Sequence, residues 1–259
     1  MEKQAGVGGE ASDIPATHRW VSASLTHVGK VRRLNEDALL DSPELGLWAV
    51  ADGVGGASAG DWASSFTLQV LERMPRPATM PAIIAEVSDQ LKSVNAALRR
   101  QAAAAEYRAI ATTVVALLFF EEHFACIWAG DSRLYLLRDA TFQQVNRDHS
   151  EVQDLVDRGI LHPTEARDHP RGNVVTRAVG AFDTLDLDVV RDRLCADDLF
   201  LLCSDGLTKV IGDDELARML AGPVDQIVSA LIETALDRGA PDNVTAIAVK
   251  VLPREDIAP

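Results

Sequence analysis

The sequence predicts a mixed α/β fold of the α+β kind, in which antiparallel strands form a central sandwich and helices pack outside it. One observation is the order of the segments, because strand-like and helical runs come in blocks without a regular βαβ repeat, which disfavours a parallel doubly wound sheet. The other is that four consecutive strand-like runs are joined by short links. Short links favour antiparallel pairing, since parallel strands need long crossovers.

The first half of the chain changes from strand to helix near Gly60. Apolar residues then recur with helical spacing over 62–74 and again over 80–98, and a cluster of prolines at 75–81 separates the two helices. Strands are expected before them, at 20–25, 38–40 and 47–51.

The second half is dominated by runs of β-branched and aromatic residues. Residues 150–172 differ, because they are polar, rich in charge, His and Pro, and carry one short helical pattern; they predict an exposed excursion. A helix is expected over 224–235. Strands are expected at 112–120, 124–129, 134–138, 142–145, 185–190, 198–203 and 244–251.

Charge and composition exclude several classes of protein. With 25 Lys+Arg against 39 Asp+Glu, the net charge is −14, which argues against sequence-independent nucleic-acid binding. The first 20 residues hold no apolar signal region, and no apolar run could span a membrane. Three cysteines without a CxxC pair favour a reducing compartment. We therefore expect a soluble, cytoplasmic monomer with no nucleic-acid or membrane partner.

The same reading predicts one domain. Residues 1–17 are rich in Gly, Ala and acid without periodicity, so they are expected to form a flexible tail. The domain is expected to cover 18–253, with a second tail at 254–259.

Acidic residues lie at the ends of several expected strands. Asp52-Gly53 and Asp205-Gly206 directly follow apolar strands, while Asp37, Asp131 and Asp242 lie at other strand edges. Any one carboxylate beside glycine is usually a turn residue. If the strands are neighbours, however, the carboxylates converge and need cations to remain ionised. An oxygen-rich cluster of this kind suits Mg²⁺ or Mn²⁺ better than zinc.

With their neighbours, these segments resemble the ordered motifs of the metal-dependent PPM (type 2C) protein serine/threonine phosphatases, in particular the bacterial single-domain members. The resemblance covers residues 20–252, and five motifs in order are a specific signal. It implies a four-layer αββα sandwich with metal ions between the sheets. The motifs are Arg32-Arg33-Leu34-Asn35-Glu36-Asp37, Ala51-Asp52-Gly53-Val54-Gly55-Gly56, Ala129-Gly130-Asp131-Ser132-Arg133, Cys203-Ser204-Asp205-Gly206-Leu207 and Asp242-Asn243-Val244-Thr245, with further matches at 148–150 and 173–180.

The resemblance implies that certain residues of these motifs bind the metal ions. Asp52 would bridge two metal ions, Gly53 would offer its carbonyl oxygen, and Glu36 would help to hold one ion. Asp205 and Asp242 would hold the other ion.

The remaining roles are implied in the same way. Asp131 would form a third metal site together with Asp205. Asp37 would orient coordinated water from behind the ligands, and Arg32 would grip the substrate phosphate. Asn243 would support the site without being a ligand.

The reaction implied is hydrolysis of phosphoserine and phosphothreonine by a metal-bridging hydroxide, with two or three Mn²⁺ or Mg²⁺ ions as cofactors. Two cations roughly 3.5–4 Å apart neutralise a phosphomonoester and lower the pKa of water between them, and a guanidinium fork recognises its oxygens. No protein nucleophile is needed. None of Cys126, Cys195 and Cys203 begins a C-x5-R loop.

Two positions depart from the family pattern, and one histidine invites two interpretations. Val54 stands where eukaryotic members commonly carry a histidine that is proposed as general acid, and Ala111 replaces a usual glycine, a change expected to affect only packing. His149 could be a ligand or an acid, but we interpret it as a local hydrogen-bonding residue. The excursion, 151–172, would be the flap of the family.

Three functions follow. The first is a phosphatase of phosphorylated proteins that opposes a bacterial Hanks-type kinase and shares its substrates, for instance in control of a secretion system. The second is a catalytically weak regulatory binding module, which is disfavoured because no expected metal ligand is missing. The third is a phosphatase of an anti-sigma-factor antagonist.

Overall fold

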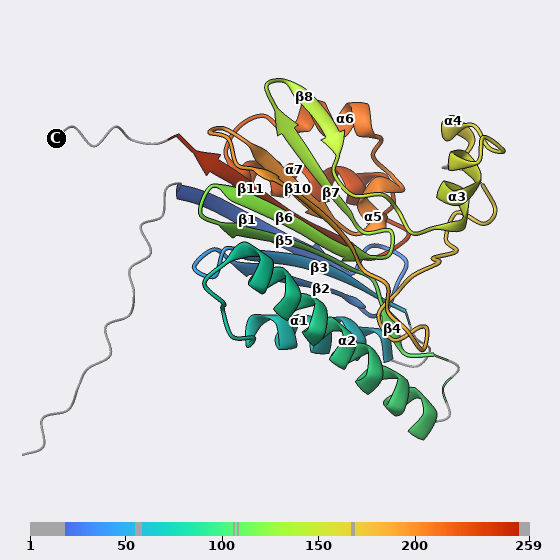
Figure 1. Cartoon of the computed structure of the whole chain (residues 1–259). Coiled ribbons are helices and arrows are strands. Elements are labelled where there is room, and N and C mark those ends of the chain that lie inside the picture. Colours follow the sequence, from blue (N-terminus) through green and yellow to red (C-terminus); the bar gives the residue numbers. More distant parts are fainter. Residues whose placement is uncertain (1–18, 55–58, 106, 108, 167–168, 254–259) are drawn as a thin grey trace, which may run out of the picture.

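The computed structural model describes residues 19–54, 59–105, 107, 109–166 and 169–253. Within them, two antiparallel sheets pack face to face and helices cover the outer face of each (Figure 1). This arrangement confirms the predicted antiparallel sandwich with helices outside it. The tails predicted at 1–17 and 254–259 lie outside the described residues.

The first sheet brings the two ends of the domain together. Its strand order is β1-β11-β10-β7-β8, and β1 pairs with β11 along nine residues, from Arg19 opposite Leu252 to His27 opposite Val244. The strands are β1 (Arg19–His27), β7 (Arg133–Arg138), β8 (Thr141–Gln144), β10 (Leu199–Cys203) and β11 (Val244–Leu252).

The second sheet has the order β2-β3-β5-β6-β9, and a short strand, β4, pairs with the end of β3. Its strands are β2 (Asp37–Ser42), β3 (Leu47–Val54), β4 (Ala111–Thr112), β5 (Val114–Phe120), β6 (His123–Ala129) and β9 (Asp188–Arg193).

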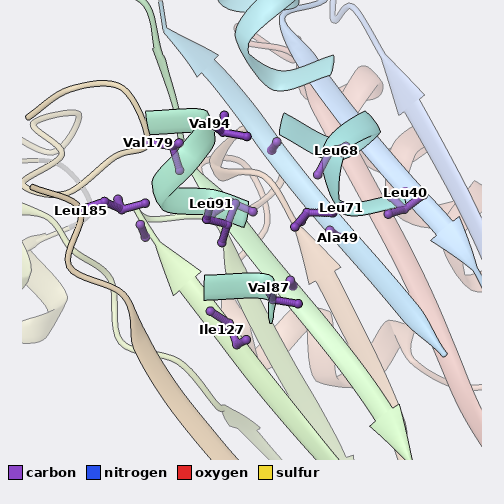
Figure 2. Packing of buried hydrophobic residues seen from close by; sticks show 14 of the residues in the cluster. Leu40, Ala49, Leu68, Leu71, Val87, Leu91, Val94, Ile127, Val179 and Leu185 are labelled. Carbon is purple, nitrogen blue, oxygen red and sulfur yellow. The ribbon is translucent and has the colours of Figure 1, made fainter. Parts of the chain in front are cut away.

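Helices α1 (Ala59–Glu72) and α2 (Met80–Ala104) cover the second sheet. Thr79 caps α2, because its side chain accepts a hydrogen bond from the Ala82 N–H, and Pro81 fits the first turn, where no intrahelical donor is needed. The buried stripe of α2 faces the strands; in Figure 2, Val87 and Leu91 point toward Ile127 of β6. The apolar residues that recur with helical spacing in the sequence therefore form the face of α2 that packs on the sheet.

The first sheet is covered by α5 (Asp205–Thr208), α6 (Asp213–Met219) and α7 (Val224–Asp237) (Figure 1). Of these, α7 buries Ile227, Val228, Leu231 and Ile232 against the sheet. Between the sheets lies an aromatic core, in which Phe119 contacts Trp48 at 4.8 Å and Phe200 at 5.3 Å between ring centroids. This core fixes the position of one sheet relative to the other, including at the end where the loops carry polar residues.

Two expectations from the sequence are corrected, and a third gains detail. The strand predicted at 185–190 is β9, which begins at Asp188, because Leu185 leaves the sheet and packs in the cluster under α2. The run 112–120 is divided into β4 and β5, since the Thr113 N–H donates to the Asp52 carbonyl at 2.8 Å. Two short helices, α3 (Glu151–Asp157) and α4 (Pro163–Ala166), occupy the excursion, which stands beside the sandwich (Figure 1).

No helix in the described part of the chain combines the length and the apolar character that a bilayer crossing needs. All three cysteines are free thiols.

Candidate metal centre

The predicted carboxylates gather at one end of the sandwich, where strand ends of both sheets meet. In the second sheet, Asp37 of β2 lies directly opposite Asp52 of β3. In the first sheet, Asp205 follows β10 and Asp242 precedes β11, its neighbour. Negative charges on Asp37, Asp205 and Asp242 all act on Asp52, so the convergence expected from the strand ends is present.

Asp37 connects the two sheets. Its Oδ2 accepts hydrogen bonds from Ser204 Oγ at 2.8 Å and Thr245 Oγ1 at 2.7 Å, both from the first sheet side. Its Oδ1 is buried without a hydrogen-bond partner. Burial and, to a smaller extent, neighbouring carboxylates raise the pKa of Asp37 to about 7, against the two hydroxyl hydrogen bonds, which lower it.

Asp52 is held by its backbone. Its N–H donates to Thr113 Oγ1 at 3.0 Å, its carbonyl accepts from Thr112 Oγ1 at 3.0 Å, and Thr113 Oγ1 lies 2.7 Å from Ser132 Oγ. Burial raises the pKa of Asp52 well above its usual range, and the charge of Asp37 adds to the effect. The carboxyl group is thus fixed in a place where its negative charge needs a cation.

Asp131 lies in the turn between β6 and β7 and is buried. Burial first, and then the charges of Asp205 and Asp148, raise the pKa of Asp131 to about 8. The preceding Gly130 has φ +123°, and a Cβ there would lie 2.5 Å from the Thr113 side chain. Glycine is therefore required for this turn to approach Thr113, whose side chain binds the Asp52 N–H.

Glu36 and Gly53 are adjacent across the end of β2 and β3, where the Gly53 N–H donates to the Glu36 carbonyl at 3.0 Å. The N-terminus of α1 closes over them. A Cβ on Gly53 would lie 2.1 Å from the Gly60 carbonyl oxygen, and one on Gly60 would lie 2.3 Å from Glu36 Oε1. Burial raises the pKa of Glu36, while a hydrogen bond from the Gly60 backbone and the charge of Arg32 lower it.

Asp205 and Asp242 are bound by cations of the chain itself. Arg32 reaches Asp242 with Nε at 3.0 Å and Nη2 at 3.1 Å. Lys209 Nζ lies 2.6 Å from Asp205 Oδ2 and 3.2 Å from Asp242 Oδ2. Asp205 Oδ1 is buried without a hydrogen-bond partner. In this side-chain arrangement, no three His, Cys, Asp or Glu groups of the described residues are placed to hold an ion.

Asn243 supports the loops around the site, as expected. Its Oδ1 accepts from the Glu36 N–H at 2.9 Å, and its Nδ2 donates to the carbonyls of Val28 and Leu34, both at 2.9 Å. Both polar atoms of its side chain thus bind backbone groups of the neighbouring loops.

His149 is a structural hydrogen-bonding residue here. Its Nδ1 accepts from the Gly130 N–H at 3.2 Å, its Nε2 lies 3.2 Å from Asp188 Oδ2, and its ring stacks on Trp128. The neighbouring Asp148 is engaged by Arg133 at 2.7 Å. His149 therefore ties the chain just before the excursion to the turn that carries Asp131 and to Asp188 of β9.

Several residues of the site were missed by sequence reasoning. Ser204 and Thr245, which bind Asp37, and Thr113 lie inside or beside quoted motifs, but only the pairing of strands shows their partners. Lys209 was also missed. Its spacing of four residues from Asp205 on a helix was the available signal, since such residues share a helix face.

A comparison of the sequence with protein families decides the identity of this fold. The family model described as Protein phosphatase 2C matches residues 30–246, a span that contains all the carboxylates described above. The chain belongs to the protein phosphatase 2C family.

Relatives in the protein phosphatase 2C family are serine/threonine phosphatases. The serine/threonine protein phosphatase PstP of Mycobacterium tuberculosis is 34% identical over 226 residues, which are 86% of this chain and 43% of PstP. The chain thus spans less than half the length of that relative.

Solved structures of the protein phosphatase 2C fold superpose closely. PppA of Pseudomonas aeruginosa, described as a key regulatory component of T6SS, is 43% identical with a TM-score of 0.85, over 90% of this chain and 98% of PppA. The catalytic domain of PstP in complex with two manganese ions is 32% identical with a TM-score of 0.83, over 92% of this chain and all of that domain.

The donor set of this phosphatase 2C site fits a hard divalent cation. The candidate ligands are carboxylate and carbonyl oxygens, which Mg²⁺ and Mn²⁺ prefer. Asp37 and Asp205 each carry a buried oxygen without a partner, and burial raises the pKa of Asp37, Asp52 and Asp131. Such carboxylates gain most from a cation, because it offsets both their desolvation and their mutual repulsion.

Proposed function

We propose that this chain is a metal-dependent phosphatase of phosphoserine and phosphothreonine in proteins. The observation that carries the proposal is the convergence of Asp37, Asp52, Asp131, Asp205 and Asp242 at one end of the sandwich, with Arg32 beside them. A group of desolvated carboxylates with one guanidinium at its rim provides both a cation site and a phosphate contact.

Each proposed metal ligand has a place in this group. Asp52 would bridge two ions, Glu36 and the Gly53 carbonyl would complete one of them, and Asp205 and Asp242 would hold the other. When bound, Mn²⁺ or Mg²⁺ supplies positive charge that offsets the phosphate's own charge and lowers the pKa of water.

A third ion would be held by Asp131 together with Asp205. Both side chains lie close enough for the charge of Asp205 to raise the pKa of Asp131. Asp37 is held by Ser204 and Thr245, and its free Oδ1 would orient the attacking water.

The residues of the chain then bind and orient the substrate. Arg32 is half exposed, so its guanidinium can leave Asp242 and form two parallel hydrogen bonds to phosphoryl oxygens. A water oxygen forms a bond to phosphorus while the bond from phosphorus to the serine or threonine oxygen breaks. That oxygen receives a proton, and inorganic phosphate leaves.

No side chain at position 54 can donate that proton. Val54 is exposed at the end of β3 and pairs with the buried Ala111 of β4. The proton for the leaving oxygen must therefore come from water or from another acid of the site.

We further propose that residues 18–253 form a single phosphatase domain with 151–172 as its flap, which acts as a cytoplasmic monomer. The phosphorylated substrates would be a Hanks-type kinase and its targets. Support comes from the similarity to PppA, which belongs to T6SS, so control of a secretion system is the setting we favour. The free cysteines agree with a reducing compartment.

The test is phosphate release from a phosphothreonine peptide, with EDTA, Mg²⁺ or Mn²⁺, for the wild type and Asp52→Ala in parallel. We expect release that depends on the metal and disappears in the variant, whose circular dichroism stays that of the wild type. No release with either metal would refute the proposal.

A further inference from the structure

Two of the proposed metal ligands share a cation that belongs to the chain. The Lys209 ammonium lies between Asp205 Oδ2, at 2.6 Å, and Asp242 Oδ2, at 3.2 Å. One carboxylate comes from α5 and the other from the loop before β11. Lys209 therefore occupies oxygens that the proposed function assigns to a divalent ion.

The backbone holds the lysine in this position. Its N–H donates to the Asp205 carbonyl at 2.8 Å, so the two side chains lie one helical turn apart on the same face. The helix is also pressed against the Asp242 loop, because a Cβ on Gly206 would lie 1.9 Å from the Asn243 carbonyl oxygen. Lys209 thus faces both carboxylates without a rearrangement of the chain.

The ammonium is both charged and partly withdrawn from water. Burial alone lowers the pKa of Lys209, but the attraction of Asp205 and Asp242 outweighs it, and the pKa is raised. The side chain is 31% exposed. A charge pair in such a place is screened less by salt and water than one on the open surface.

Arg32 adds a second cation on one of the same carboxylates. Its two nitrogen atoms lie 3.0 and 3.1 Å from Asp242, yet its side chain is 52% exposed and can turn toward solvent. Lys209, by contrast, bridges two carboxylates and is less exposed. Of the two cations, Lys209 is therefore the stronger competitor for an incoming ion.

We propose that Lys209 is a built-in counter-ion, which stabilises the metal-free site and competes with the divalent cation for Asp205 and Asp242. This inference rests on the proposed function, since it takes these residues as ligands. Any contact that stabilises the metal-free state alone weakens metal affinity by the same factor. Lys209 then sets a threshold concentration of metal. Below it, the ammonium stays bound to Asp205 and Asp242 in place of the divalent ion.

The test is calorimetric titration of the full chain with Mn²⁺, combined with thermal unfolding in EDTA. Lys209→Met keeps the length of the side chain and removes its charge. We expect this variant to bind Mn²⁺ about tenfold more tightly, which corresponds to about 1.4 kcal/mol, and to unfold at a lower temperature in EDTA. Lys209→Arg keeps the charge and is expected to stay within about threefold of the wild type.

The matched control is Lys250→Met. Lys250 lies near the other end of β11, and its Nζ is 3.6 Å from Asp197. Its removal changes the net charge equally, so it is expected to leave the affinity for Mn²⁺ unchanged. A gain in affinity that is equal in both variants would refute a local role for Lys209.

The remaining outcomes separate this inference from the proposed function. If the wild type binds Mn²⁺ and Lys209→Met binds it equally or more weakly, the counter-ion role is wrong while the metal site stands. If the wild type binds no Mn²⁺, the proposed function itself fails. Should Lys209→Met fail to fold in EDTA, Lys209→Gln is titrated instead and judged by the same affinities.

Discussion

Asp37 and Asp52 are register partners across the β2–β3 pair, and the charge of Asp37 helps to raise the pKa of Asp52. Burial is the larger cause for both residues. The first residue of β2 and a residue near the end of β3 are thus carboxylates that repel each other in a desolvated place. Without a cation these carboxylates therefore lower the stability of the fold, an arrangement that is typical of functional sites.

Asp52→Asn is expected to abolish phosphate release and to lower the affinity for Mn²⁺ at least about 100-fold, because it removes a bridging ligand. The metal-free variant should unfold at a temperature equal to or higher than that of the wild type, since an uncompensated buried charge is lost. Thermal unfolding with EDTA and with Mn²⁺ checks both statements.

The control for Asp52→Asn is Asp89→Asn on the exposed face of α2, where the aspartate is paired with Lys92 at 3.5 Å. It removes the same charge and should change neither turnover nor Mn²⁺ binding. An Asp52→Asn variant that is unfolded in EDTA would contradict the assignment of Asp52 to metal binding.

The metal-free protein is expected to lose stability as the pH rises from about 4 to 8. Asp37 and Asp131 have pKa values raised from 3.8 to about 7 and about 8, so in this range the folded state binds more protons than the unfolded state. Stability then falls with pH and levels off above the folded pKa values. In EDTA, we expect the unfolding temperature at pH 8 to lie at least about 5 °C below that at pH 5.5.

Saturating Mn²⁺ should remove most of this difference, because the ions favour the ionised carboxylates. Asp131→Asn should flatten the profile in EDTA. An unfolding temperature in EDTA that rises over the same range would show that these carboxylates are ionised in the metal-free fold.

The sequence predicted the fold and most of the carboxylates for a simple physical reason. A strand that is buried on both faces reads as a continuous apolar run, so the first carboxylate that follows this run, such as Asp52 or Asp205, lies near the end of the strand. Helical periodicity likewise marked α1 and α2. These signals are local in the sequence, and they agree with the structure within a few residues at each boundary.

Contacts between the sheets could not be predicted in this way. The hydroxyls of Ser204 and Thr245 reach Asp37 only because β10 and β11 lie across the sandwich from β2. The bridge made by Lys209 depends instead on the pairing of β10 with β11, which brings Asp205 close to Asp242. The start of β9 was misjudged because Leu185 is apolar for packing under α2 and not for the sheet. The periodicity of apolar residues alone does not distinguish a residue that packs under a helix from one that belongs to a strand.

Gly53→Ala is expected to destabilise the protein by about 2–3 kcal/mol, because its Cβ would lie 2.1 Å from the Gly60 carbonyl oxygen and 2.7 Å from the Glu36 carbonyl oxygen. Backbone atoms cannot rotate away as a side chain would. The same shift should displace Glu36 and lower phosphate release about tenfold. Urea unfolding in EDTA and the peptide assay measure the two effects.

Gly159→Ala serves as the comparison, since a Cβ there meets nothing within 4 Å and only its φ of +67° opposes the change. We expect it to cost about 1 kcal/mol without any effect on turnover. Equal losses of stability for both variants would mean that the short distance from Gly53 to the Gly60 carbonyl is not the reason why alanine destabilises this position.

Arg32→Ala is expected to lower kcat/KM for a phosphothreonine peptide by roughly 10–100-fold, since it removes a charge-assisted, bidentate contact to phosphate. The unfolding temperature in EDTA should change little, because the Arg32 side chain is half exposed and its pair with Asp242 is screened by water. Arg33→Ala removes the same charge from the next, also exposed, residue and is expected to keep kcat/KM within about twofold. Inorganic phosphate, tested as a product inhibitor, should bind more weakly to Arg32→Ala but not to Arg33→Ala. Equal losses in both variants would attribute the effect to the net charge near the site, and Arg32 would then have no specific contact with the phosphoryl group.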